Sequence, residues 1–242
     1  MSIPNPISNS NPATSVRHAG PHLGALAIVY TVLFNAGLYP VTTFADKIHF
    51  PGPWESGDVI VAYFQTHAAA VLTCAFLQIG ATIALGIFAA TVVSRLQFLG
   101  VRAAGPYIAL FGGFLTVVNS IAAGSILWVL VHPGIAQDAT LVRALYYLSY
   151  AFGGPGFSIP MGLLLAGVCV PAAFRKLLPK WLVIFGLALA VCGELSWLNL
   201  VLPGALFLIP LVRFPGFIWL IAAGFLLPRA MARRLRSAEV AA

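Results

Sequence analysis

The sequence predicts an all-α, polytopic membrane protein with six transmembrane helices and one short interfacial helix on the outer side. Six long apolar runs support this fold class, in a chain that is 60% hydrophobic and only 8% charged. The mean hydropathy of +0.97 lies far above the soluble range, and so few charged residues could not cover the surface of a soluble protein of this size. The runs are unbroken rather than alternating, which favours helices over barrel strands.

The thickness of a membrane sets the length that each apolar run needs to cross it. The hydrocarbon core is about 30 Å thick and a helix rises about 1.5 Å per residue, so about 20 apolar residues cross it. A helix also satisfies its own backbone hydrogen bonds in lipid. The predicted spans cover residues 22–44, 66–94, 106–131, 141–172, 181–201 and a stretch within 205–231.

The chain divides into one membrane domain and two polar ends. Residues 1–20 are rich in Ser, Asn and Pro without an apolar face, which predicts a disordered cytoplasmic N-terminus. Residues 21–232 form the six-helix transmembrane domain. Residues 233–242 form a basic cytoplasmic tail close to anionic lipid.

The distribution of charge predicts the topology. The chain has 13 Lys and Arg residues, and ten of them fall at the ends of the chain or in the loops after the second and fourth spans. Those ten are Arg17, Arg95, Arg102, Arg175, Lys176, Lys180, Arg229, Arg233, Arg234 and Arg236. Only Lys47, Arg143 and Arg213 lie toward the other side, so the positive-inside rule places both termini in the cytoplasm. The net charge of +7 is an orientation signal, and no basic patch interleaved with aromatics indicates nucleic-acid binding.

The loop at 45–65 predicts the interfacial helix. Phe50-Pro-Gly-Pro-Trp54 reads as a turn, and Ser56 or Asp58 is suited to cap a helix that follows. A single helix from Ser56 to the end of the second span would be far longer than the membrane. We therefore expect a short helix near 56–65, then a bend, then the span.

Polar residues inside the spans define a candidate pocket, because lipid makes such residues costly. Two interpretations compete. In the first, these side chains form interhelical hydrogen bonds and small residues allow close packing. In the second, they line a polar cavity in the outer half of the bundle. The candidates are Asn35, His67, Gln78, Asn119, Ser158, Glu194 and Arg213.

The fourth span contains a helix break. Phe152-Gly-Gly-Pro-Gly-Phe-Ser-Ile-Pro160 holds two prolines and three glycines in nine residues. Each proline removes a backbone donor, so we expect kinked or non-helical backbone at 153–160 that faces other helices. One interpretation is a structural kink, and the other is a broken helix whose freed carbonyls line a binding site, as in transporters.

The last two spans carry opposite charges at matching depth. Glu194 and Arg213 lie about equally far from the turn at Pro203, so an antiparallel hairpin brings them level. A lone charge at that depth is costly, and we therefore expect the two to pair. If Arg213 reaches the interface instead, we expect a neutral Glu194 hydrogen-bonded to Asn35, Gln78 or Asn119.

Cofactor and catalytic signals are weak. His67 has no second histidine at its depth with which to bind haem or a metal. The three cysteines follow no metal or redox spacing and read as small hydrophobes. No nucleophile elbow, zincin motif or phosphate loop occurs, and Ser158 with His67 is only a formal nucleophile–base pair. The sequence thus predicts no cofactor, no metal and no catalytic residue.

Several segments resemble a known family. Phe76-Leu-Gln-Ile-Gly80, Leu85-Gly-Ile-Phe88, Ser94-Arg-Leu96, Gly154-Pro-Gly-Phe157 and Arg213-Phe-Pro-Gly-Phe217 are similar to those of a bacterial family of six-helix inner-membrane proteins with a domain of unknown function. The resemblance covers nearly all of the chain after residue 20. It implies the bacterial inner membrane and the helix count, and it assigns no site residue.

Three functional classes are compatible with the sequence. The first is a binding or regulatory protein in the lipid bilayer, with a small apolar or amphipathic ligand. The second is a small-molecule or ion transporter or channel that uses the broken fourth span. The third is an intramembrane enzyme, which the missing catalytic motifs disfavour.

The topology prediction can be checked with reporter fusions at residues 50 and 240. We expect the fusion at 50 to report the outer side and the fusion at 240 the cytoplasm, because of the charge asymmetry. A matching location for the two reporters would overturn the six-span topology.

Overall fold

The computed structural model describes residues 15–42 and 49–232, and it confirms an all-α polytopic membrane protein. Six helical segments are long and apolar enough to cross a membrane. They are Leu23–Val41, Ala68–Phe98, Gly105–Leu130, Ala139–Arg175, Lys180–Leu200 and Pro203–Leu226. Each overlaps one of the six predicted runs. Residues 1–14 of the predicted N-terminal segment and the predicted tail at 233–242 lie outside the described residues.

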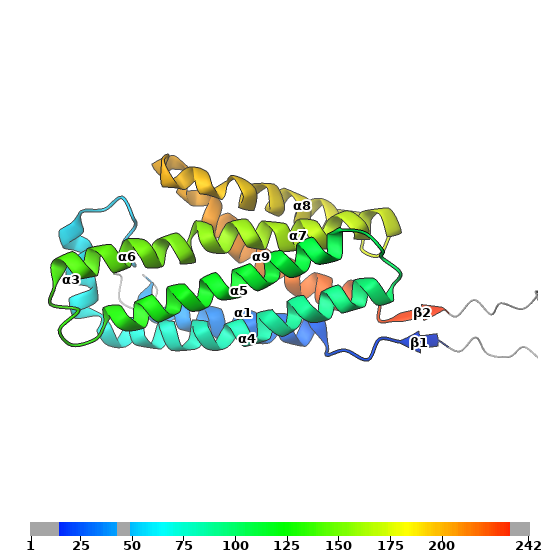
Figure 1. The fold of residues 1–242 in the computed structure, drawn as a ribbon, viewed down its shortest axis with the longest axis horizontal. Coiled ribbons are helices and arrows are strands. Elements are labelled where there is room, and N and C mark those ends of the chain that lie inside the picture. The colour runs from blue at the N-terminus through cyan, green and yellow to red at the C-terminus, as the bar shows by residue number, and fades with distance from the viewer. Residues whose placement is uncertain (1–14, 43–48, 233–242) are drawn as a thin grey trace, which may run out of the picture.

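The elements form one bundle in which neighbours along the chain are also neighbours in space (Figure 1). The described elements are β1 (Ser15–Arg17), α1 (Leu23–Leu38), η1 (Tyr39–Val41), α3 (Gly57–Thr66), α4 (Ala68–Phe98), α5 (Gly105–Leu130), α6 (Ala139–Gly153), α7 (Pro155–Arg175), α8 (Lys180–Leu195), η2 (Ser196–Leu200), η3 (Pro203–Phe207), α9 (Leu208–Leu226) and β2 (Ala230–Ala232). α1 packs on α4, α4 on α5, α5 on α7, α7 on α8 and α8 on α9. The ring closes because α9 packs back on α1.

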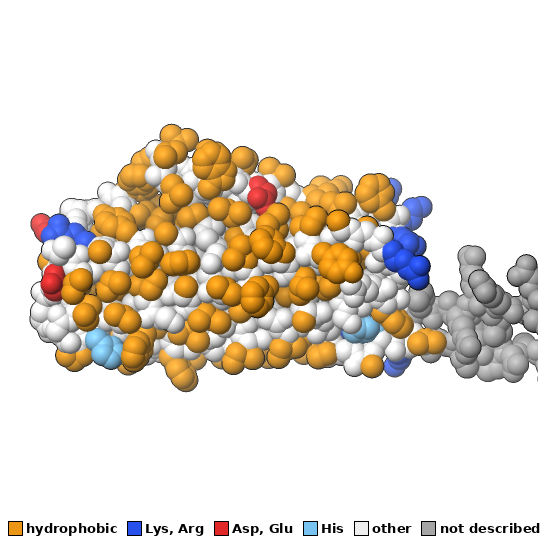
Figure 2. Space-filling view, viewed as in Figure 1, with side chains coloured by type: hydrophobic (Ala, Val, Ile, Leu, Met, Phe, Trp, Pro, Cys, Tyr) orange, Lys and Arg blue, Asp and Glu red, His pale blue; other side chains and the backbone are white. Residues whose placement is uncertain are grey.

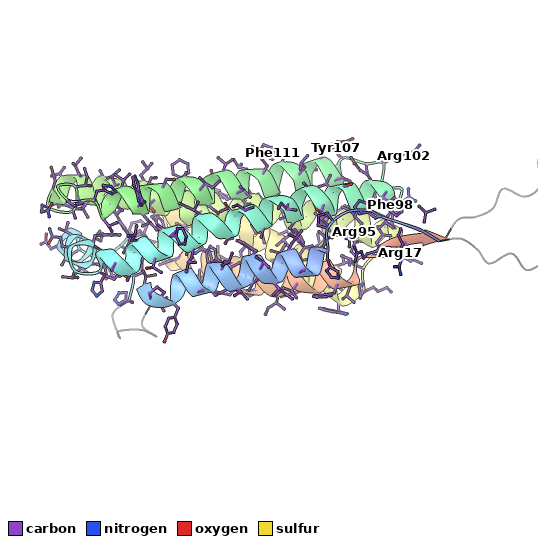
Figure 3. The ribbon with its side chains drawn as sticks, turned by 90° about the horizontal axis from the view of Figure 1, so that it is seen from below. Arg17, Arg95, Phe98, Arg102, Tyr107 and Phe111 are labelled. Atoms are coloured by element: carbon purple, nitrogen blue, oxygen red, sulfur yellow. The ribbon has the colours of Figure 1, made fainter. Side chains whose placement is uncertain are left out.

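Both described ends of the chain meet at one end of the bundle (Figure 1). β1 pairs antiparallel with β2, and Arg17 lies opposite Ala230. This ladder was not predicted. Residues 15–17 form its first strand, so the predicted disorder of residues 1–20 is wrong for these three residues. Arg95 and Arg102 lie at the same end of the bundle as Arg17 (Figure 3).

The predicted short helix and bend are confirmed. The Ser56 hydroxyl accepts a hydrogen bond from the Val59 N–H and so caps α3. The helix ends at His67, whose backbone leaves the helical region (φ −114°, ψ 28°), and α4 begins at the next residue. α4 has 31 residues and is therefore about 46 Å long. It exceeds the thickness of the hydrocarbon core, so its ends reach into the boundary layers.

The predicted break in the fourth span is also confirmed. Gly154 separates α6 from α7 with a non-helical backbone (φ −86°, ψ −99°), and Pro155 opens α7. Proline suits this first position because the N–H that it lacks would have no helical acceptor there. Gly154, Pro155 and Ser158 are buried against other helices, as predicted.

The bundle presents a largely apolar surface to its surroundings, and Figure 2 shows hydrophobic side chains spread along this face, with Lys and Arg side chains at its ends and an acidic side chain midway. The fourth span differs from the others because 67% of its most apolar window is buried inside the protein, against 33–44% for the other five. This span therefore lies closest to the core, and the break at Gly154 is surrounded by protein.

Glycine allows α5 and α7 to approach each other closely. A Cβ atom on Gly112 would lie 2.5 Å from both the Leu164 nitrogen and the Pro160 carbonyl oxygen of α7. These are backbone atoms, so the contact could be relieved only by moving a helix. Gly80, also within a span, would meet nothing within 4 Å.

The two glycines provide a matched test of this packing. We expect Gly112→Ala to lower the free energy of unfolding by about 1–3 kcal/mol through overpacking. Gly80→Ala should leave it unchanged or raise it by up to about 1 kcal/mol, because alanine favours the helix. Thermal unfolding in detergent would measure both. Equal effects of the two substitutions would contradict the close α5–α7 contact.

Candidate functional site

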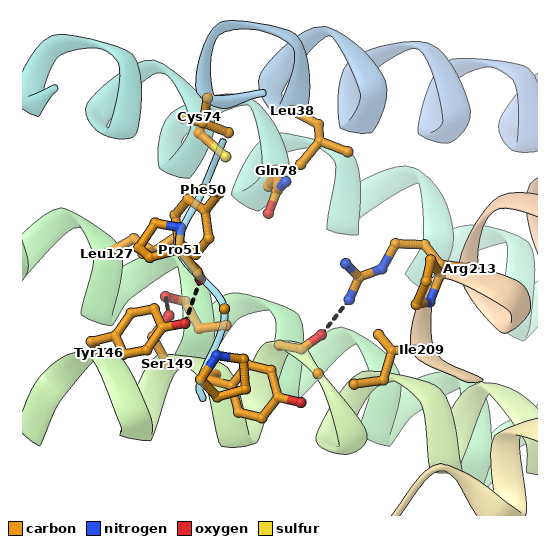
Figure 4. A pocket seen from close by; sticks show the side chains of 18 of the residues that line it. Leu38, Phe50, Pro51, Cys74, Gln78, Leu127, Tyr146, Ser149, Ile209 and Arg213 are labelled. Carbon is orange, nitrogen blue, oxygen red and sulfur yellow. Dashed lines mark hydrogen bonds between the residues drawn. The ribbon is translucent and has the colours of Figure 1, made fainter. Parts of the chain in front are cut away.

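A cavity of about 260 Å³ lies beside the loop at 50–53 that precedes α3, and Figure 4 shows the side chains that line it. Side chains from α1, α4, α5, α6 and α9 form its walls, and the loop at 50–53 lies over it. Leu38, Leu127 and Ile209 give the walls their apolar character, and Gln78 and Arg213 are among the few polar lining residues. Apolar walls with a few polar groups are typical of small-molecule sites.

The loop over the cavity is held by specific contacts. The Tyr146 hydroxyl donates a hydrogen bond of 2.5 Å to the Pro51 carbonyl, and the Phe50 ring packs against the ring of Tyr146. The Gly52 N–H donates to Glu55 Oε1 at 2.6 Å. This hydrogen bond holds the pKa of Glu55 below its usual value. The loop is thus a built part of the site.

Arg213 forms the floor of the cavity. Its Nη2 atom donates to the Gly153 carbonyl at the helix break. That carbonyl has no helical donor because the Phe157 N–H bonds to the Gly154 carbonyl instead. The guanidinium carbon lies 4.6 Å from the centre of the Phe157 ring and 5.4 Å from that of Phe34. Cation–π contacts of this kind stabilise a charge in dry surroundings.

A second carbonyl at the break is satisfied by Asn119. Pro160 has no N–H to donate to the Gly156 carbonyl four residues earlier. Asn119 Nδ2 donates to this carbonyl from α5 at 2.6 Å. The carbonyls of Gly153 and Gly156, exposed by the break, therefore accept hydrogen bonds from side chains of other helices.

The predicted pairing of Glu194 with Arg213 is wrong. Arg213 points to the helix break, and the only ion pair among the described residues joins His49 and Glu55. Glu194 Oε1 lies close to Gly162 of α7 and has no hydrogen-bond partner. The alternative, in which Glu194 bonds to a neutral polar residue, is not found either. Counting along a hairpin gives equal depth, but it does not give the rotation of each helix about its axis.

The structure brings only two of the seven predicted pocket residues to the cavity, namely Gln78 and Arg213. Asn35 donates to the Thr31 carbonyl of its own helix at 2.8 Å. His67 stacks on the Tyr63 ring with centroids 4.7 Å apart, because α3 ends there. Ser158 is fully buried in α7, and its hydroxyl has no partner. The remaining two, Asn119 and Glu194, occupy the helix contacts described above.

Sequence reasoning missed the polar face that α6 contributes. Tyr146, Ser149 and Tyr150 line the cavity beside Gly153. The Ser149 hydroxyl donates to the Ala123 carbonyl at 3.2 Å, and the Tyr150 hydroxyl donates to Asn199 Oδ1 at 2.6 Å. The spacing i, i+3, i+4, i+7 from residue 146 to 153 was the available signal, since it places these positions on one helix face.

Metal and redox chemistry find no assembled site in the described part of the chain. No group of three or more His, Cys, Asp or Glu residues there lies in an arrangement that could hold a metal ion. Cys74 lies on the cavity wall, and all three cysteines are free thiols. Ser158 and His67 lie on α7 and at the α3–α4 junction, so they do not form a nucleophile–base pair.

Comparisons of the chain with known protein families, with curated proteins and with solved structures find no match.

The role of Asn119 can be tested with a double-mutant cycle. Asn119→Leu should lower the free energy of unfolding by about 1–3 kcal/mol, because it leaves the Gly156 carbonyl without a donor. Pro160→Ala restores a backbone N–H at the position that lacks one, so Asn119→Leu should cost much less in that background. Thermal unfolding in detergent gives the four stabilities.

Ser120→Ala is the control, because that hydroxyl bonds only to the Thr116 carbonyl of its own helix. We expect it to change stability by less than about 0.5 kcal/mol. Strictly additive effects of Asn119→Leu and Pro160→Ala would show that Asn119 does not compensate for the proline.

Proposed function

We propose that this multi-pass membrane protein binds a small amphipathic molecule in the cavity between α1, α4, α5, α6 and α9. One observation carries the proposal: the cavity of about 260 Å³ has apolar walls and a single cationic group among its lining residues. The cavity suits a compact ligand, because sites for drug-sized molecules start at about 300 Å³.

The closed floor supports binding over transport. Beyond Arg213 the bundle continues as a core of buried hydrophobic residues, in which Tyr30, Phe34 and Phe217 contact one another. The carbonyls of the helix break that a transporter would offer to an ion already accept hydrogen bonds from Arg213 and Asn119. The transporter alternative thereby loses the feature that most favoured it.

The cellular setting is part of the same proposal. The predicted cytoplasmic side is the end at which β1 and β2 meet, and the cavity then faces the outer side. The charge distribution supports this orientation. The segments that resemble a bacterial six-helix family support a place in the bacterial inner membrane.

Filling the cavity tests the proposed function. Leu127 lies on the cavity wall and is 7% exposed. We expect purified wild-type protein in neutral detergent to give saturation-transfer NMR signals with benzoate or benzamide as probes. Leu127→Trp should remove these signals, because the indole ring would occupy the site.

Ile83→Trp is the matched control, since Ile83 is 67% exposed on the outer surface of α4. It adds the same side chain and should leave the signals unchanged. Identical probe signals for wild type and Leu127→Trp would refute the proposed site, because they would then come from the detergent or from elsewhere on the protein.

A further inference from the structure

The charge of Arg213 is not balanced by a described carboxylate. Nη2 is engaged with the Gly153 carbonyl, and the Nε atom has no hydrogen-bond partner. A guanidinium has five N–H donors, so most of its capacity is unused. Glu194, the acidic residue within the described spans, lies against α7 and does not reach it. A buried cation without a counter-charge is costly, which makes this position a place where an anion is stabilised.

Gln78 adds a second source of donors. It lines the cavity from α4, and no described residue forms a hydrogen bond with its amide. Figure 4 shows the Gln78 amide and the Arg213 guanidinium facing the same space. The three hydroxyls on the wall differ, because Tyr146, Ser149 and Tyr150 already donate to protein acceptors. The unsatisfied polar groups of the cavity therefore include a guanidinium and a primary amide.

We infer that the ligand is a small organic monoanion whose carboxylate binds Arg213 and Gln78. Its apolar part lies against Phe50 and Leu127, which Figure 4 shows across the cavity from Arg213. Guanidinium binds planar carboxylates through paired N–H donors. One cation in the cavity matches one negative charge, whereas a phosphate dianion would leave a negative charge uncompensated among apolar side chains. This inference rests on the proposed function and specifies the class of ligand.

The test compares two probes of nearly equal shape. Benzoate carries the carboxylate, and benzamide is its neutral counterpart. Binding of each is measured by titration followed by saturation-transfer NMR, at constant ionic strength and in neutral detergent. We expect wild-type protein to bind benzoate at least tenfold more tightly than benzamide. Arg213→Met should abolish this preference, so that the ratio of benzoate to benzamide affinity falls to within twofold of one.

Two further variants guard against a folding defect in Arg213→Met, which also removes the donor to the Gly153 carbonyl. Gln78→Leu breaks no described hydrogen bond, and we expect it to lower the ratio of benzoate to benzamide affinity several-fold. Arg143→Gln is the control for net charge. Arg143 is an exposed residue of α6 near the same end of the bundle, and its loss should not change the preference.

The outcomes separate this inference from the proposed function. Suppose that both probes bind equally, that Arg213→Met does not change this, and that Leu127→Trp abolishes it. The proposed binding site would then be supported, and the inference that the ligand carries a carboxylate would be overturned. If Leu127→Trp reduces the binding of neither probe, the proposed binding site and the carboxylate inference are both overturned. Asp46 lies outside the described residues, so Asp46→Asn is included. A preference for benzoate that appears only in that variant would show that Asp46 neutralises Arg213, and would overturn the inference for the native protein.

Discussion

The structure depends on the requirement that backbone carbonyls inside a membrane have hydrogen-bond partners. The Gly/Pro segment of the fourth span leaves two carbonyls without their usual helical donors. Pro160 has no N–H, and the Phe157 N–H bonds to the Gly154 carbonyl because of the break there. Arg213 of α9 donates a hydrogen bond to the Gly153 carbonyl, and Asn119 of α5 donates one to the Gly156 carbonyl. The most buried span is thus tied by side chains to α5 and α9.

This requirement also explains why a charged residue is tolerated within the bundle. The guanidinium of Arg213 obtains one strong acceptor from the break and two aromatic rings, Phe34 and Phe157, from the core. These contacts fix the side chain and keep its charge at the boundary between the dry core and the cavity. A neutral donor could satisfy the carbonyl equally well, so the carbonyl alone does not account for the charge, and the proposed anionic ligand is the counter-charge that we infer for it.

The sequence predicted the fold well because lipid imposes simple rules. The length of the apolar runs predicted the six spans. The cap at Ser56 predicted the start of α3, and the prolines at 155 and 160 predicted the break. The site was predicted less well because it depends on rotation and on loops. His67 shares a helical spacing with Cys74 and Gln78, yet the bend between α3 and α4 removes it from their face. Glu194 and Arg213 share a depth but face different helices.

The two interpretations of the polar residues, interhelical bonding and a cavity, both hold, each for different residues. Asn119 bonds to a backbone carbonyl of another helix, and Asn35 to one of its own. Gln78 has no such described partner and faces the cavity, and Arg213 does both. Depth and residue type alone therefore do not separate the two roles, because the role depends on which helix face each residue occupies. Gln78 and Arg213 are the two that bring unpaired donors to the cavity, beside the break of the fourth span.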